Sequence, residues 1–257
     1  MEFFIQRVGG ATAILRVGEL RIAIDPVLCP KGSVQDYFWF KSRRIEEPRY
    51  SPHDFDQIDL WLITHNHEDH LDAPGIRQIR EEAEVICNGN ARKKLLREGK
   101  GHLKVLKRGR QMTLSRKGFD IYVEAIPAIH GVNPLSALLA GRGNGYYLRI
   151  SGGGETCSIY FTGDTVLKEK IFKALGDRRV DLLLPNMGAA MQGSWIMTLT
   201  LNARMLEKMI ARLHPRLVVP LHYGTFEHYR EPSEKIEALA RPEIMMLSPG
   251  REVRLPL

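Results

Sequence analysis

The segment Thr64–Asp72, which reads THNHEDHLD, directly follows the largely apolar run at residues 58–63. A short apolar run of this kind is typical of a buried strand. The cluster of histidines and acidic residues that follows it would lie at the carboxyl end of that strand. The sequence therefore predicts a sheet that carries a group of metal-binding side chains at one edge.

The spacing within this segment bears on the number of metal ions. His65 and His67 are two residues apart, so in an extended chain they point to the same side. Asp69 and His70 follow the turn and can face a second point in space. Imidazole nitrogen and carboxylate oxygen suit zinc, iron or manganese. One loop could therefore supply ligands to two metal ions.

Other polar residues end apolar strands in the same way. They are His130 after residues 123–129, Asp164 after residues 158–163, and His222 after residues 217–221. The carboxyl ends of neighbouring strands meet at one edge of an open α/β sheet, where such proteins place their sites. A lone histidine at a strand end is usually structural, but the repeated placement predicts one shared site.

Hydrophobic periodicity predicts an α/β protein. Residues 2–26 read as a β-meander and residues 27–57 as a long ordered loop. Helices are expected at 74–83, 91–97, 168–175, 201–213 and 233–240, the last capped by Ser233. Strands are expected at 58–64, 84–87, 103–106, 111–114, 119–126, 145–151, 157–162, 180–185, 216–221, 243–247 and 252–255. With no low-complexity linker or repeat, we expect one domain over residues 1–257, in which two sheets pack face to face between outer helices.

The positive charge of the chain is concentrated in one segment. Residues 92–117 contain eleven lysines and arginines against the single acid Glu98, within a chain of net charge +7. Such a segment could meet a phosphate backbone, an anionic surface or an acidic substrate, or could simply be a solvated face.

Cys29, Cys87 and Cys157 are odd in number and widely spaced, which favours free thiols in a reducing compartment. The first ten residues lack the pattern of a secretory signal, and no apolar run has the length of a membrane span. We therefore expect a cytoplasmic protein.

The motifs together resemble those of the metallo-β-lactamase-fold hydrolases. THNHEDHLD is an HxHxDH motif, and His130, FTGDT at 161–165 and PLHYGTF at 220–226 follow in the order of that family. The branch that contains L-ascorbate-6-phosphate lactonase and N-acylphosphatidylethanolamine phospholipase D is the nearest in pattern, with IDPV at 24–27 as a further match. The chain departs from that branch at Gly10, where the branch usually has histidine.

The resemblance implies a four-layer αββα sandwich of two mixed sheets flanked by helices. It also implies two divalent ions, with zinc favoured and manganese or iron also compatible. Three residues would hold the first ion, three the second, and Asp164 would bridge both. The first set is His65, His67 and His130, and the second is Asp69, His70 and His222.

Asp25 and four other histidines are left with open roles. Asp25 could accept a hydrogen bond from a ligand histidine or simply form a turn before Pro26. We expect His53, His102, His214 and His228 to be surface or structural residues, although His228 could reach the rim of the site because it follows His222 closely.

The leading functional hypothesis is a dinuclear metal-dependent hydrolase, in which a metal-bridging hydroxide attacks a small ester, lactone or phosphodiester. Asp69 and Asp164 are the catalytic candidates. The alternatives are a nuclease acting through residues 92–117 and a non-catalytic metal-binding scaffold. The sequence also allows a homo-oligomer. The segments 37–40, 131–143 and 187–197 could wall the substrate pocket, although the aromatic cluster at 37–40 could equally anchor its loop on the core.

Overall fold

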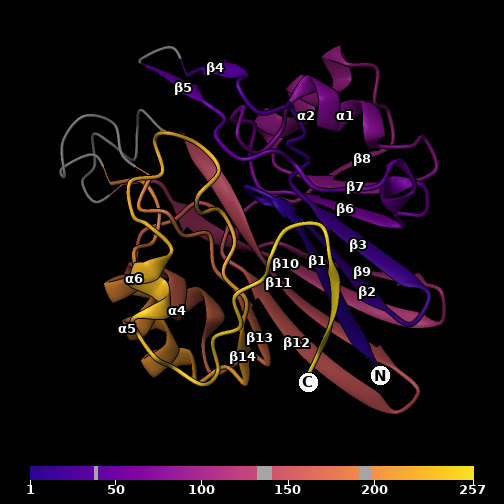
Figure 1. Ribbon diagram of the computed structural model, residues 1–257. Coiled ribbons are helices and arrows are strands. Elements are labelled where there is room, and N and C mark those ends of the chain that lie inside the picture. Colours follow the sequence, from indigo (N-terminus) through magenta and orange to yellow (C-terminus); the bar gives the residue numbers. More distant parts are fainter. Residues whose placement is uncertain (38–39, 132–140, 191–197) are drawn as a thin grey trace.

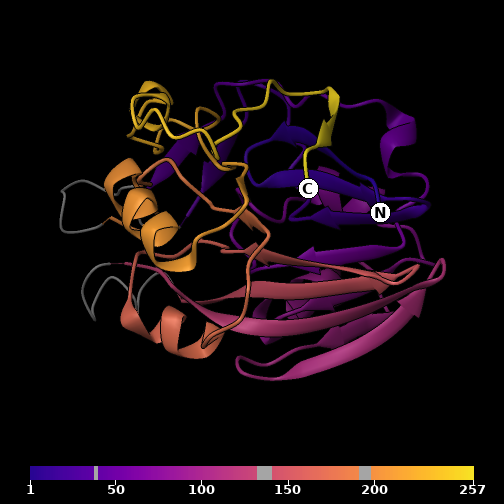
Figure 2. The ribbon, with the colours of Figure 1, turned by 90° about the horizontal axis from the view of Figure 1, so that it is seen from below.

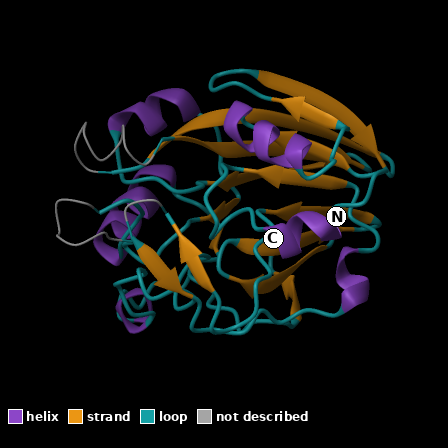
Figure 3. Cartoon of the chain, turned by 90° about the horizontal axis from the view of Figure 1, so that it is seen from above, coloured by secondary structure: helices purple, strands orange, loops and turns teal. Residues whose placement is uncertain are grey.

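The computed structural model describes residues 1–37, 40–131, 141–190 and 198–257. Two sheets lie face to face, and helices cover their outer sides (Figures 1, 2 and 3). This is the four-layer αββα sandwich of two mixed sheets that the sequence predicts.

The first sheet has the order β15-β1-β2-β3-β6-β7-β8. Its strands are β1 (Phe3–Gly9), β2 (Thr12–Val17), β3 (Leu20–Ile24), β6 (Leu60–Ile63), β7 (Glu84–Cys87), β8 (Leu103–Val105) and β15 (Glu252–Leu255). The meander β1-β2-β3 is antiparallel, as predicted, and β3, β6, β7 and β8 run parallel. The carboxyl end of β6 therefore lies beside those of β3 and β7.

The second sheet has the order β14-β13-β12-β11-β10-β9. Its strands are β9 (Gln111–Arg116), β10 (Phe119–Ile129), β11 (Arg142–Gly152), β12 (Glu155–Phe161), β13 (Leu182–Leu184) and β14 (Leu217–Val218). β9 to β12 are antiparallel, whereas β12, β13 and β14 are parallel.

Five helices flank the sheets within the described residues (Figure 1). α1 (Ala73–Gln78) and α2 (Gly89–Arg97) cover the first sheet, and α4 (Glu169–Leu175), α5 (Ala203–Leu213) and α6 (Glu234–Glu237) cover the second. Asn88 and Asn202 cap α2 and α5 by accepting from the backbone amides of Ala91 and Met205.

The alternation of side chains within the strands builds these layers. In β6, Leu60 and Leu62 face the core between the sheets, whereas Trp61 and Ile63 face α1 and α2. All four side chains are fully buried. A strand covered on both faces reads as a continuous apolar run, which is why this strand was recognisable in the sequence.

Several local predictions were wrong. The 27–57 loop contains a small hairpin, β4 (Val34–Asp36) and β5 (Lys41–Arg43), and the 3₁₀-helix η1 (Pro52–Phe55). Residues 243–247 form only an isolated bridge, between Ile244 and Val218. The last helix is a single turn, and the Ser233 side chain makes no capping hydrogen bond. Such short elements depend on tertiary contacts more than on periodicity. The three cysteines are free, as predicted, and all three are buried.

The core between the sheets can be tested at Leu148 on β11, which is fully buried there. Leu148→Ala should lower the free energy of unfolding by about 2–5 kcal/mol, because it removes buried methyl groups and leaves a cavity. Chemical denaturation measures the change. Leu96→Ala is the matched control, because Leu96 is 43% exposed, and an equal loss in both variants would contradict this packing.

Candidate metal centre

The loop after β6 is held by hydrogen bonds at both of its ends. The amides of His70 and Leu71 both donate to the carbonyl of His67, which closes a turn inside the loop. Asp72 ends the loop and caps α1 by accepting from the Gly75 amide at 2.7 Å. The same carboxylate accepts from the backbone amides of residues 28 and 29. The loop between β6 and α1 is thus tied to the segment that follows β3.

Three other strand ends bring their polar residues to the same edge. His130 follows β10 directly, and Asp164 follows β12 after the turn at Gly163. Gly163 has φ +57°, and a Cβ there would lie 2.4 Å from the Asn144 carbonyl oxygen, so this turn requires glycine. His222, with φ 61°, follows the β14 segment and donates its amide to the Gly10 carbonyl.

The structure brings all seven predicted site residues together, and they form two groups. Within each group, one donor atom per residue lies within 4.8 Å of the others. The first group is His65, His67 and His130, and the second is Asp69, His70, Asp164 and His222. All are buried except His67, which is partly exposed.

Asp164 lies between the two groups. Its Oδ1 is 3.1 Å from His70 Nε2 and 3.5 Å from His222 Nε2, and its Oδ2 is 3.6 Å from His130 Nε2. Each carboxylate oxygen therefore faces a different group. Asn186, next to β13, orients Asp164 by donating to Oδ1 at 2.9 Å.

Asp25 contacts a site histidine, as the first of its two candidate roles predicts. Its Oδ2 lies 2.7 Å from His70 Nδ1 and accepts from the Thr64 hydroxyl, while its Oδ1 accepts from the Thr64 amide. His70 Nδ1 therefore faces Asp25, and its Nε2 points into the second group, 3.1 Å from Asp164 Oδ1.

Comparison with known proteins assigns the chain to a family. Residues 20–223 match the profile of the beta-lactamase superfamily domain.

The chain belongs to this superfamily.

The similar proteins agree with this placement. A UPF0173 metal-dependent hydrolase of Pyrococcus horikoshii is 27% identical over 96% of this chain and 97% of its own length. The structure of "a possible metal-dependent hydrolase" from Veillonella parvula aligns over 99% of this chain and all of its own, with TM-score 0.84 and 20% identity. That of isothiocyanate hydrolase from Delia radicum gut bacteria aligns over 97% and 98%, with TM-score 0.77 and 20% identity. At these identities the structures support the fold alone.

Burial and neighbouring charges shift the pKa values of the histidines and aspartates at this site. Burial and the neighbouring histidines lower the pKa of His65 well below its usual value, and burial and His130 lower that of His67 to about 4. His70 differs, because Asp164, Asp25 and Asp69 outweigh its burial and raise its pKa. Facing imidazoles hold the pKa values of Asp69 and Asp164 well below the usual range despite burial.

The donor set suits divalent metal ions. Both ring nitrogens of His130 and Oδ1 of Asp69 are buried and have no hydrogen-bond partner among the residues that the structure describes. Such atoms are costly unless something binds them. His65 and His67 favour the neutral form, which is the form that binds metal, and the carboxylates favour the ionised form.

Sequence reasoning left the role of His228 open and missed Tyr229, and both lie beside Asp69. His228, predicted to be surface or structural or to reach the rim of the site, is buried, and its Nε2 lies 3.1 Å from Asp69 Oδ2. Tyr229 donates to the same oxygen at 3.2 Å. The only signal in the sequence was their closeness to His222. By contrast, His53, His102 and His214 are exposed, as expected.

The predicted pocket walls are described only in part. Tyr37 stacks on Phe40 at 4.7 Å between ring centroids, and the Tyr37 ring meets the edges of His67 and His228. These two aromatic residues therefore lie against the metal centre. Residues 38–39 of this cluster, 132–140 and 191–197 fall outside the described residues.

The basic segment 92–117 is divided among α2, β8 and β9, and ion pairs offset part of its charge. Lys94 pairs with Glu68, and both Lys104 and Arg116 pair with Glu84. Near the candidate metal centre, Lys93 and Arg97 of α2 line a hollow of about 430 Å³ together with Asn66 and Glu68 of the loop after β6.

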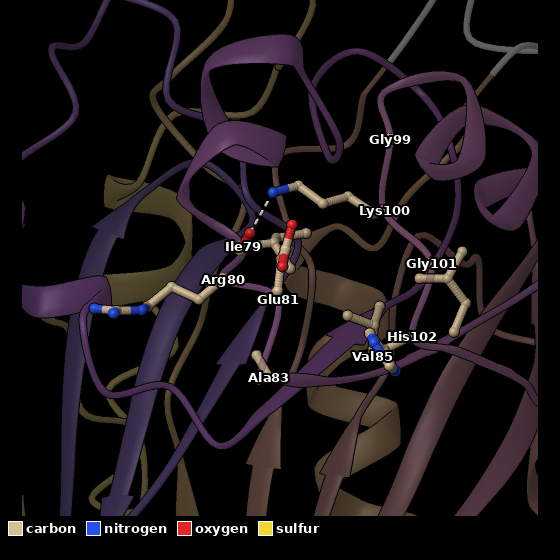
Figure 4. A pocket seen from close by; sticks show the side chains of 10 residues that line it. Ile79, Arg80, Glu81, Ala83, Val85, Gly99, Lys100, Gly101 and His102 are labelled. Carbon is tan, nitrogen blue, oxygen red and sulfur yellow. Dashed lines mark hydrogen bonds between the residues drawn. The ribbon is translucent and has the colours of Figure 1, made fainter.

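A separate pocket of about 230 Å³ lies at the opposite edge of the first sheet (Figure 4). Ala83 and Val85 line it at the amino end of β7, and Lys100 reaches across it to the carbonyl of Ile79. Since the seven site residues lie at the carboxyl ends of the strands, this pocket is separate from the metal centre.

The lowered pKa of His67 predicts a pH dependence of stability in metal-free protein. The pKa of His67 is near 6.5 in the unfolded chain and about 4 in the folded chain. At a pH between these two values, His67 is largely protonated in the unfolded chain but not in the folded one. Lowering the pH through this window should therefore reduce the free energy of unfolding. Denaturation of chelator-treated protein from pH 7 to 4 tests this, and His67→Gln should flatten part of the slope. An identical slope in that variant would contradict the assignment.

Proposed function

We propose that this chain is a dinuclear metal-dependent hydrolase that acts on a small ester, lactone or phosphodiester. The observation that carries the proposal is the position of Asp164, whose two oxygens face two different groups of ligand-type side chains. The names of the similar proteins, metal-dependent hydrolases, support the reaction type.

The residues of each group would divide two cations between them. His65, His67 and His130 would hold the first, Asp69, His70 and His222 the second, and Asp164 would contact both. Zinc suits this mixed nitrogen and oxygen set, and manganese or iron would also be accepted. Bound there, the cations would lower the pKa of a water molecule and polarise the reacting oxygen of the substrate.

The chain's own groups would then orient the attack. Asp69 is held in the ionised form, because facing histidines lower its pKa, so it could orient the attacking water and pass its proton on to the leaving group. Asp25 holds the ring of His70 so that Nε2 faces the site. Tyr37 and Phe40 provide an apolar aromatic surface beside His67 for the uncharged part of a substrate.

A small substrate is favoured over nucleic acid. Three of the eleven basic side chains in residues 92–117 are paired with Glu68 or Glu84, which reduces the positive charge that a phosphate backbone would meet. Experiments can distinguish a small-molecule hydrolase from the two alternatives, a nuclease and a non-catalytic metal scaffold.

Asp164→Ala should lower the bound metal from two ions per chain to at most one and reduce hydrolysis to background, because it removes the contact shared by both groups. Metal analysis and a turnover assay measure the two effects. Asp181→Ala is the matched control: Asp181 is also a buried carboxylate, but it bonds to Ser158 on β12, away from the site. Wild-type metal content and turnover in Asp164→Ala would refute the dinuclear proposal.

The substrate class can be tested with a panel of generic lactones, aryl esters and bis(p-nitrophenyl) phosphate. We expect turnover of at least one class, its loss on chelation, and its return with zinc, manganese or iron. Full metal occupancy without turnover on a wide panel would favour the scaffold. Cleavage of RNA or DNA, with binding that weakens steeply as salt rises, would favour the nuclease.

A further inference from the structure

A buried chain of hydrogen bonds reaches Asp69 from outside the seven-residue set. Ser42 on β5 lies 2.7 Å from His228 Nδ1, and His228 Nε2 lies 3.1 Å from Asp69 Oδ2. All three side chains are buried. This chain of hydrogen bonds connects the β4–β5 hairpin, the segment after His222 and the loop after β6.

The chemistry of the three partners determines where the protons lie. An ionised carboxylate only accepts, so the proton shared with Asp69 must be on His228 Nε2. Ser42 Oγ already accepts the backbone amide of His228 at 3.3 Å, which leaves its hydroxyl proton free to donate to Nδ1. The Nε2–H of His228 is thereby aimed at Asp69.

The same oxygen of Asp69 receives a second donor, the hydroxyl of Tyr229, at 3.2 Å. These two donors fix the rotation of the carboxylate, and His222 Nε2 of the second group lies 3.4 Å from the same oxygen. Oδ1 is buried and has no hydrogen-bond partner among the described residues. Tyr37 and Phe40 pack edge-on against the His228 ring and limit its movement.

We propose that His228, oriented by Ser42, is a positioning residue that holds Asp69 in the geometry required to bind the second cation. This inference rests on the proposed dinuclear function and adds to it a residue outside the ligand set. Partners of this kind orient metal ligands in other proteins, and their loss typically weakens metal binding about tenfold to a hundredfold.

Two amide substitutions separate the two hydrogen bonds of His228. Glutamine places an amide nitrogen near the position of Nε2, so His228→Gln can keep the bond to Asp69. Asparagine reaches only the position of Nδ1, so His228→Asn can keep the bond to Ser42 but not that to Asp69. Both variants lose the aromatic ring, so they are matched for packing.

The readouts are zinc bound per chain at buffered free zinc, and the melting temperature of the chelator-treated protein. We expect His228→Asn and His228→Ala to bind the second ion about tenfold to a hundredfold more weakly and the first ion unchanged. His228→Gln should bind both nearly as the unsubstituted protein does. Ser42→Ala should give a smaller loss at the second site, because it removes only the support of the ring.

Three outcomes would overturn the inference. They are wild-type binding of both ions in His228→Asn, equal weakening in the Gln and Asn variants, and weakening that merely follows a fall in metal-free melting temperature. If the unsubstituted protein binds no metal, the proposed function itself fails. If it binds two ions and His228→Asn does too, only the positioning role fails.

Discussion

The burial of many ionisable side chains at one edge of the sandwich is the constraint on which the site depends. Five imidazoles and two carboxylates gather there, and six of the seven are buried. Burying charge away from water is costly unless the charges are paired or bind metal. The pKa shifts reflect this balance, since facing histidines keep Asp69 and Asp164 ionised although burial opposes it.

The residues behind the candidate ligands account for much of the precision of the site. Asp25 orients the ring of His70, Asn186 orients Asp164, and Asp72 ties the loop after β6 to the segment after β3. Each contributes from a different part of the chain. The fold holds such partners in place because the ligands leave the ends of strands packed in two sheets, where little movement is allowed.

Predictability from sequence varied with the length and burial of each element. β6 was recognisable because both of its faces are buried, and α5 because its apolar residues recur with helical spacing. The β4–β5 hairpin was missed, because its strands have only three residues each and only the middle residue of each is buried. The capping role expected of Ser233 also failed, in a helix of one turn.

The sequence by itself determined the seven candidate ligands and their place at strand ends, because an apolar run followed by polar residues is a local pattern. Only the tertiary structure decided which oxygen of Asp164 faces which group, that Asp25 bonds to His70, and that His228 reaches Asp69. The physical reason is that these contacts join residues 34 to 159 positions apart in the chain. No local periodicity records such a contact; it exists only once the two sheets have packed and their strand ends have met.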